Sequence, residues 1–66
     1  AREQAHVLLD ALASLPTAQR EAFLLQAEGG LSVADIAQTT GVALETAKSR
    51  LRYARATLRQ TLEACL

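Results

Sequence analysis

Five of the seven basic side chains in this 66-residue chain fall between residues 46 and 60. That stretch contains no acidic residue and has a local charge of +5 from Lys48, Arg50, Arg52, Arg55 and Arg59. Residues 1–45 hold two basic and six acidic residues, a balance of −4, so the formal net charge of zero hides an uneven distribution. Lysine and arginine displace the counterions condensed on nucleic-acid phosphates. The stretch is therefore a candidate phosphate-binding surface, the simpler alternative being a solvated helix face.

Apolar residues in the same region predict one long amphipathic helix, from near Ala43 or Leu44 to about Ala64. Its stripe recurs at intervals of three and four residues and comprises Leu44, Ala47, Leu51, Ala54, Leu58 and Leu62. At about 100° per residue, the opposite side carries Glu45, Ser49 and Tyr53, with Thr46 and Arg52 close by and Lys48 and Arg50 on the two flanks. A helix that reads base edges between two phosphate walls needs this arrangement of central polar groups and flanking cations.

The sequence offers no constellation for catalysis or metal binding. His6 and Cys65 lie near opposite ends, and a single cysteine forms neither an internal disulfide nor a cysteine-based metal site by itself. Neither a Ser/His/Asp set nor a glycine-rich phosphate loop is present. Asp35 and Glu45 fall in first turns of predicted helices, where acidic residues are favourable. We expect no enzymatic activity, no metal and no cofactor.

The composition favours helices over strands. The chain has 14 Ala and 12 Leu but one Ile, one Phe, one Tyr and no Trp, whereas strands are rich in β-branched and aromatic residues. The length allows one domain, residues 1–66. No apolar stretch approaches the roughly 18 residues of a membrane span, and no signal peptide is recognisable. We expect a cytoplasmic module, and, because the chain does not begin with Met, a part of a longer protein.

Two helices are expected before residue 30. The first runs from about Arg2 to Ser14, with an apolar face of Ala5, Leu8, Leu9, Leu12 and Leu15. The second begins at Pro16 or Thr17, because proline suits a first helical turn. It ends at Gly29-Gly30, since glycine adopts the left-handed conformation of many helix ends. Its stripe is Ala18, Ala22 and Leu25, with Phe23 beside it.

A third, short helix precedes the long one. Ser32 and Asp35 resemble a capping box at its start, and its buried side is Val33, Ile36, Ala37 and Thr40. Gly41 ends it, and Val42 fills the corner before the long helix. A short capped helix, a glycine turn and a longer helix with outward cations are typical of a helix-turn-helix, whose second helix enters the DNA major groove. We predict an all-α, four-helix domain with a C-terminal helix-turn-helix over about residues 32–64 and no winged elements.

Several segments together form a more specific pattern over roughly residues 12–60. They are Leu15-Pro16, Gln19–Leu25, Glu28–Ser32, Asp35–Ala37, Gly41-Val42, Thr46–Leu51, Ala54-Arg55 and Leu58-Arg59. This combination resembles region 4 of bacterial RNA polymerase sigma factors, in particular the extracytoplasmic-function (ECF) group. The resemblance implies recognition of the −35 promoter element in double-stranded DNA while bound to RNA polymerase core. It also implies contact with the polymerase β-subunit flap and, in many members, inhibition by an anti-sigma factor.

Carried over position by position, the resemblance assigns the groove-facing stretch to Thr46, Lys48, Ser49 and Arg50. Glu45 lies on the same surface and could accept a hydrogen bond from a cytosine amino group, and Lys48 could reach either guanine or phosphate. The next groove-facing turn carries Arg52 and Tyr53. Candidate phosphate contacts are Arg50, Arg55, Arg20 and the backbone N–H of Ser32 at a helix N-terminus. Arg59, like Arg55, lies further along and is a candidate for phosphate or polymerase.

Three positions depart from the family pattern. Arginine is common where Tyr53 stands, and a tyrosine there could touch a phosphate or a thymine methyl group instead of reading a base as arginine does. Valine is common where Ala47 stands, which predicts looser packing under the recognition helix. Ala43 replaces a residue that often caps the helix, a loss that typically costs about 1 kcal/mol.

Two other interpretations share parts of this pattern. The LuxR-type helix-turn-helix of transcriptional regulators has a similar skeleton, but the long basic continuation after Ser49 favours a sigma factor. A protein-interaction module would use the apolar faces of the first and fourth helices, and an anti-sigma factor would cover such surfaces. The basic stretch gives no support to an exclusively protein-binding role.

Overall fold

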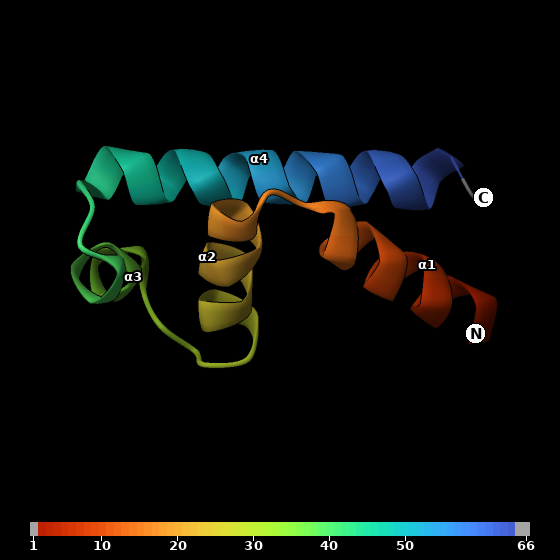
Figure 1. The fold of residues 1–66 in the computed structure, drawn as a ribbon, viewed down its shortest axis with the longest axis horizontal. Coiled ribbons are helices and arrows are strands. Elements are labelled where there is room, and N and C mark those ends of the chain that lie inside the picture. Colours follow the sequence, from red (N-terminus) through yellow and green to blue (C-terminus); the bar gives the residue numbers. More distant parts are fainter. Residues whose placement is uncertain (1, 65–66) are drawn as a thin grey trace.

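The computed structural model describes residues 2–64 of the chain, and the side chains of residues 5–64. In this range the chain forms the α-helices α1 (Arg2–Ser14), α2 (Thr17–Ala27), α3 (Val33–Thr40) and α4 (Leu44–Ala64), and no strand (Figure 1). The all-α prediction with a C-terminal helix-turn-helix is confirmed. Cys65 lies outside the described residues. No helix within residues 2–64 has both the length and the apolar character needed to cross a membrane.

Helix α4 runs nearly the whole length of the molecule, and the other three helices pack along one side of it (Figure 1). Its 21 residues rise about 30 Å, and the longest dimension of the molecule is 35 Å. Helix α2 crosses below the middle of α4, α3 lies below its N-terminal end, and α1 lies below its C-terminal half (Figure 1). The orientation of α4 is therefore set by contacts with all three.

Two clusters of buried apolar side chains divide α4 between its partners. The first joins α2, α3 and the N-terminal half of α4 and consists of Ala22, Ile36, Ala37, Ala47 and Leu51, with Leu25, Leu31, Val33 and Val42 packed against it. The second joins α1 to the C-terminal half of α4 and consists of Ala11, Leu15, Ala54 and Leu58, with Leu12 and Phe23 alongside. Ala47 has no exposed surface, so α2 and α3 fully cover this small residue.

Local chemistry fixes the turn between α3 and α4. The Ser32 hydroxyl accepts a hydrogen bond of 3.1 Å from the Asp35 backbone N–H and caps α3, as predicted. Gly41 has φ 70° and ψ 34°, the left-handed conformation that glycine adopts without steric cost. The backbone N–H groups of Gly41 and Val42 bond to the carbonyls of Gln38 and Ala37 at 3.3 Å and 3.0 Å, which is a Schellman motif. Val42, partly buried against the first cluster, completes the corner.

The connection from α2 to α3 requires glycine for two different reasons. Helix α2 ends at Ala27, with Glu28 as a right-handed C-cap. A side chain at Gly29 would place its Cβ 2.6 Å from the Leu25 carbonyl oxygen, so close backbone approach excludes one. The left-handed conformation predicted for the glycine pair belongs to Gly30, with φ 68°.

The predicted stripe of α4 is wrong at its first residue. Leu44 is 45% exposed, whereas Ala47, Leu51, Ala54 and Leu58 are buried. Leu44 and Leu62 are 18 residues, or five turns, apart and share one angle, about 50° from the centre of the four buried residues. Both therefore lie at the edge of the stripe, and Leu62 is half-buried.

The predicted faces of α1 and α2 also need correction. In α1, Ala11 and Leu15 are buried and Leu12 is half-buried, but Ala5, Leu8 and Leu9 are exposed. Helix α1 diverges from α4 toward its N-terminus, so its first turns have no helix to cover them (Figure 1). In α2, Ala22 is buried and Leu25 and Phe23 are half-buried, while Ala18 in the first turn is exposed.

Leu51→Ala and Leu44→Ala form a matched pair on α4. Leu51 is 2% exposed, and its truncation leaves a cavity, so we expect a loss of at least about 2 kcal/mol in the free energy of unfolding. Leu44→Ala should change that free energy by no more than about 0.5 kcal/mol. Urea unfolding followed by circular dichroism measures both, and equal losses would place Leu44 in the core.

Candidate nucleic-acid interface

The outer face of the first half of α4 gathers most of the predicted groove-facing residues. Ala47 and Leu51 hold this half of α4 against α2 and α3, and the side chains on the opposite side are turned to solvent. Ser49 is half-buried, and the exposed members of this group are Glu45, Thr46, Lys48, Arg52 and Tyr53. The helix-turn-helix thus presents one continuous polar surface about three turns long.

Two contacts organise the side chains on this face. The Lys48 Nζ lies 3.5 Å from Glu45 Oε1, three residues earlier in the helix. These side chains are 55% and 83% exposed, and exposed pairs of this kind contribute 0 to about 1 kcal/mol. Because this pair is weak, breaking it costs little, and each side chain can then bind a group on DNA. The second contact places the Arg52 guanidinium 5.3 Å from the centre of the Tyr53 ring.

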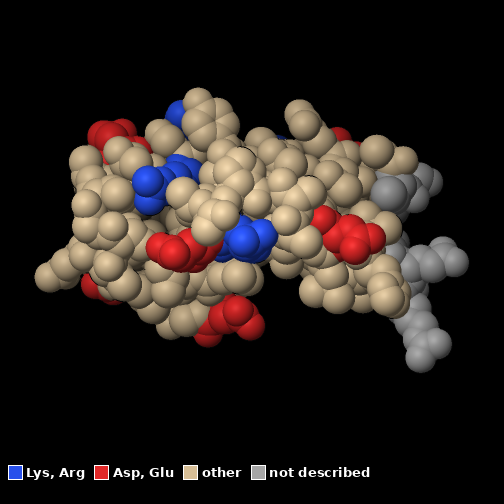
Figure 2. Space-filling model, in the orientation of Figure 1, with Lys and Arg blue, Asp and Glu red and all other residues tan. Residues whose placement is uncertain are grey.

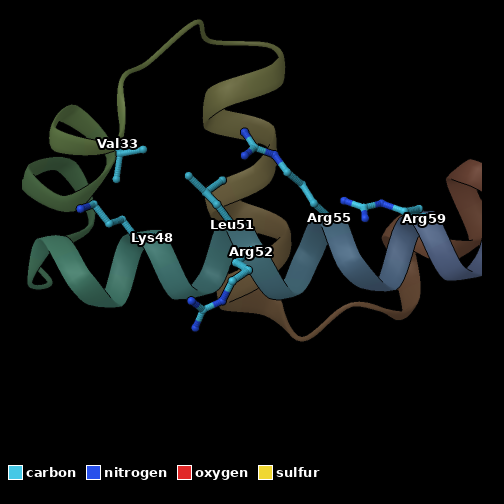
Figure 3. Close-up of a pocket in the computed structure, with 6 residues that line it drawn as sticks. All are labelled: Val33, Lys48, Leu51, Arg52, Arg55 and Arg59. Atoms are coloured by element: carbon cyan, nitrogen blue, oxygen red, sulfur yellow. The ribbon is translucent and has the colours of Figure 1, made fainter.

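Four cations of α4 occupy one flank of the helix. Lys48, Arg52, Arg55 and Arg59 are spaced by four, three and four residues, which keeps them on one side. With Val33 and Leu51 they line a shallow groove of about 290 Å³ (Figure 3). Arg50 lies on the other flank by the same helical geometry and is half-buried. A helix with cations on both flanks can meet both phosphate walls of a groove.

Two predicted phosphate contacts already have partners within the domain. The Arg20 guanidinium donates a hydrogen bond of 3.1 Å to the Ala13 carbonyl near the end of α1. The Arg55 guanidinium donates to the side-chain oxygen of Gln26 in α2. Both arginines thereby tie helices together. A guanidinium has five N–H donors, so each arginine keeps donors for a second partner. Contact of these two arginines with phosphate therefore stays a prediction.

The surface around these cations is not uniformly positive. On the face shown in Figure 2, the Lys and Arg side chains lie among Asp and Glu side chains. Attraction to DNA would therefore depend on local groups of cations, such as the row on α4, and not on the charge of the whole domain. Ser32, whose hydroxyl caps α3, places the N-terminus of that helix at the surface.

The structure adds an apolar residue to the candidate interface. Leu44 is exposed beside Glu45 at the start of α4, and an apolar side chain at that place could contact a thymine methyl group. The sequence gives one indication that Leu44 is exposed, which is its angle on the helical wheel at the edge of the apolar stripe. Val33 also joins the site through the groove, and no local pattern indicates this because Val33 comes from α3.

Among the described side chains, no group of three or more His, Cys, Asp or Glu residues is placed to hold a metal ion. His6 is exposed on α1. Within residues 5–64, no polar or charged side chain is buried.

Comparison with known proteins bears on this geometry. A sequence model of the family described as "Sigma-70, region 4" matches residues 5–58. This range covers α2 and α3, most of α1 and α4, and both buried clusters. No curated protein matches the chain.

Ser32→Ala tests how far the cap stabilises the candidate interface. Loss of the bond from the Asp35 N–H should lower the free energy of unfolding by about 1 kcal/mol, and Ser32→Asp should retain most of it. Thr39→Ala, at an exposed position on the same helix, should leave stability unchanged or slightly raised, because alanine has the higher helix propensity. Chemical unfolding of the three variants checks this, and an equal loss in both alanine variants contradicts it.

Proposed function

The chain belongs to the sigma-70 region 4 family and is a promoter-binding domain of a sigma factor, and from that premise we propose that it reads the −35 element in the major groove. The observation that carries the proposal is the outer face of α4, where hydrogen-bonding groups lie between flanking cations. The capped helix α3 and the left-handed Gly41 position that face. This is the docking geometry of a recognition helix.

Base reading falls to the exposed groups in the first three turns of α4. Glu45 is suited to accept from a cytosine amino group, and Lys48 donates to guanine or to phosphate. Thr46 and Ser49 have short hydroxyl side chains that bond to either kind of base edge. Leu44 offers apolar surface to a thymine methyl group, and Tyr53 belongs to the same outer face of α4. These residues make the domain selective for a short, non-palindromic site.

Phosphate contacts position the helix in the groove. Arg50 serves one wall, and the row that includes Lys48 and Arg55 serves the other. The backbone N–H of Ser32 at the N-terminus of α3 adds a helix-dipole contact, and Arg20 is a further candidate. Arg59 lies on the same flank as Arg55, in the half of α4 that extends beyond the reading face, and serves phosphate or polymerase.

The partners of the domain follow from the same proposal. The family implies interaction with DNA and RNA polymerase, and we propose the polymerase β-subunit flap as the docking site and the cytoplasm as the location. The exposed Leu8 and Leu9 of α1 provide apolar surface for polymerase or for an anti-sigma factor. The ECF group is proposed from the resemblance of the motifs. The family is one of DNA-binding domains, and the family match gives the sigma interpretation precedence over a LuxR-type regulator.

The charge of the domain predicts that it binds DNA weakly by itself. With a net charge of zero, non-specific attraction to the duplex is small and falls steeply with salt. Attachment to polymerase and the rest of the sigma chain raises the effective concentration of the domain at the promoter. Useful affinity is therefore expected only in that assembly.

Lys48→Ala and Arg52→Ala should each weaken promoter binding without unfolding the domain, because both side chains are exposed. A lost phosphate contact lowers the slope of log affinity against log salt by about 1, whereas a lost base contact costs about 1–3 kcal/mol at one position. Binding titrations at several salt concentrations separate the two. Gln60→Ala, also exposed but in the last turns of α4, is the control and should bind as the parent does. Loss of helicity in either cation variant would contradict the proposal.

Selection of bound sequences from random duplex DNA tests the function directly. The domain is carried in a sigma chain bound to polymerase core, at low salt. Enrichment of one short, non-palindromic motif that disappears in the Lys48→Ala, Arg52→Ala double variant supports the −35 proposal. A palindromic motif with spaced half-sites would indicate a dimeric regulator, and no enrichment at any salt would leave only the protein-binding interpretation.

A further inference from the structure

Arg52 differs from the other cations in the row along α4. Arg52 lines the groove together with Lys48, Arg55 and Arg59. Its guanidinium, however, extends across α4 to the side away from Val33 and Leu51, whereas Arg55 points up beside α2 (Figure 3). The guanidinium lies 5.3 Å from the centre of the Tyr53 ring, and Tyr53 is 55% exposed on the outer face of α4.

The aromatic ring is the partner that the structure gives to this guanidinium. Within residues 5–64 the single ion pair joins Lys48 to Glu45, and no hydrogen bond from Arg52 accompanies the ring contact among those side chains. A guanidinium over an aromatic ring is attracted by the electrons of the ring face. A guanidinium that stacks its flat face on a ring keeps its N–H edge free for hydrogen bonds.

Guanine requires two N–H donors on one edge of a guanidinium. Arginine donates two parallel hydrogen bonds to O6 and N7 of guanine in the major groove, and this contact depends on the plane of the guanidinium. A long arginine side chain in water samples many rotamers and loses that freedom on binding. A ring that already restrains the guanidinium reduces this loss, which is the effect of preorganisation on affinity.

We propose that Tyr53 is a positioning residue that turns Arg52 from the phosphate flank toward the groove floor, where Arg52 reads a guanine. This inference rests on the proposed function, since it assigns a base class to one side chain of the same interface. It differs from a direct role for Tyr53, in which the tyrosine itself contacts a thymine methyl group or a phosphate. In the positioning role, the effect of Tyr53 exists only while Arg52 is present.

A double-mutant cycle on the selected duplex separates the two roles. With Arg52 present, Tyr53→Ala should weaken binding about threefold, the order of an exposed cation–π contact. In the Arg52→Ala background, the same change should have no effect. Tyr53→Phe keeps the ring and should restore parental affinity. An equal loss in both backgrounds, or a Tyr53→Phe variant as weak as Tyr53→Ala, overturns the proposal in favour of direct contact.

Replacing the guanine by 7-deazaguanine removes the N7 acceptor without changing base pairing. The parent chain should lose at least about fivefold in affinity at that position, and Arg52→Ala should lose nothing further. Tyr53→Ala should show a smaller response than the parent. An equal response in the parent and in Arg52→Ala shows that another side chain reads that base and overturns the proposal.

Arg59→Ala is the matched control for charge. It removes a cation from the same flank of α4, whereas the ring of Tyr53 contacts Arg52. It should weaken binding alike for all sequences and leave the guanine preference intact. Circular dichroism verifies the fold of each variant. A selected motif that lacks guanine overturns the inference alone, whereas no motif for the parent chain removes the proposed function and the inference together.

Discussion

Close packing of α4 against its three partners is the constraint on which the rest of this structure depends. Ala47 and Ala54 have no exposed surface, and Leu51, which lies between them in the sequence, is 2% exposed. Small side chains let neighbouring helices approach closely, and a bulkier residue would force them apart at a cost of typically 1–3 kcal/mol. The face that we propose for reading DNA is the reverse side of the same helix, so the proposal implies that the packing of the core also decides which residues face DNA.

The turn before α4 fixes the direction in which α4 leaves α3. Gly41 and the two backbone bonds of the Schellman motif fix the path of the chain out of α3, and Val42 is held in the corner by the first apolar cluster. The Ser32 cap stabilises the other end of the same short helix. The cap, the Schellman motif and the packing of Val42, all within eleven residues, therefore define how α3 and α4 meet. They are needed because an isolated helix of eight residues is not stable by itself.

The sequence predicts the helix ends well, because caps and turns depend on residues close together in the chain. It predicts burial less well. Periodicity gives the angle of a residue but not the extent of the partner helix, so Leu8 and Leu9 are expected inside and lie outside. The hydrogen bond from Arg55 to Gln26 joins residues 29 positions apart and has no local signal. The contact of Arg52 with Tyr53 is equally hidden, because adjacent residues on a helix do not ordinarily face one another.

A domain with no net charge that reads DNA must concentrate its cations where they act. The acidic residues of the first 45 positions offset the basic stretch, so attraction to an arbitrary duplex is small while the flanks of α4 stay positive. Weak non-specific binding lowers the competition from the excess of wrong sites in a genome. The affinity given up in this way can be restored by attachment to polymerase, which acts through effective concentration and does not depend on sequence. In the proposed function, discrimination then rests on the side chains of the outer face of α4, where the fold provides hydrogen-bonding groups and one guanidinium 5.3 Å from the centre of an aromatic ring.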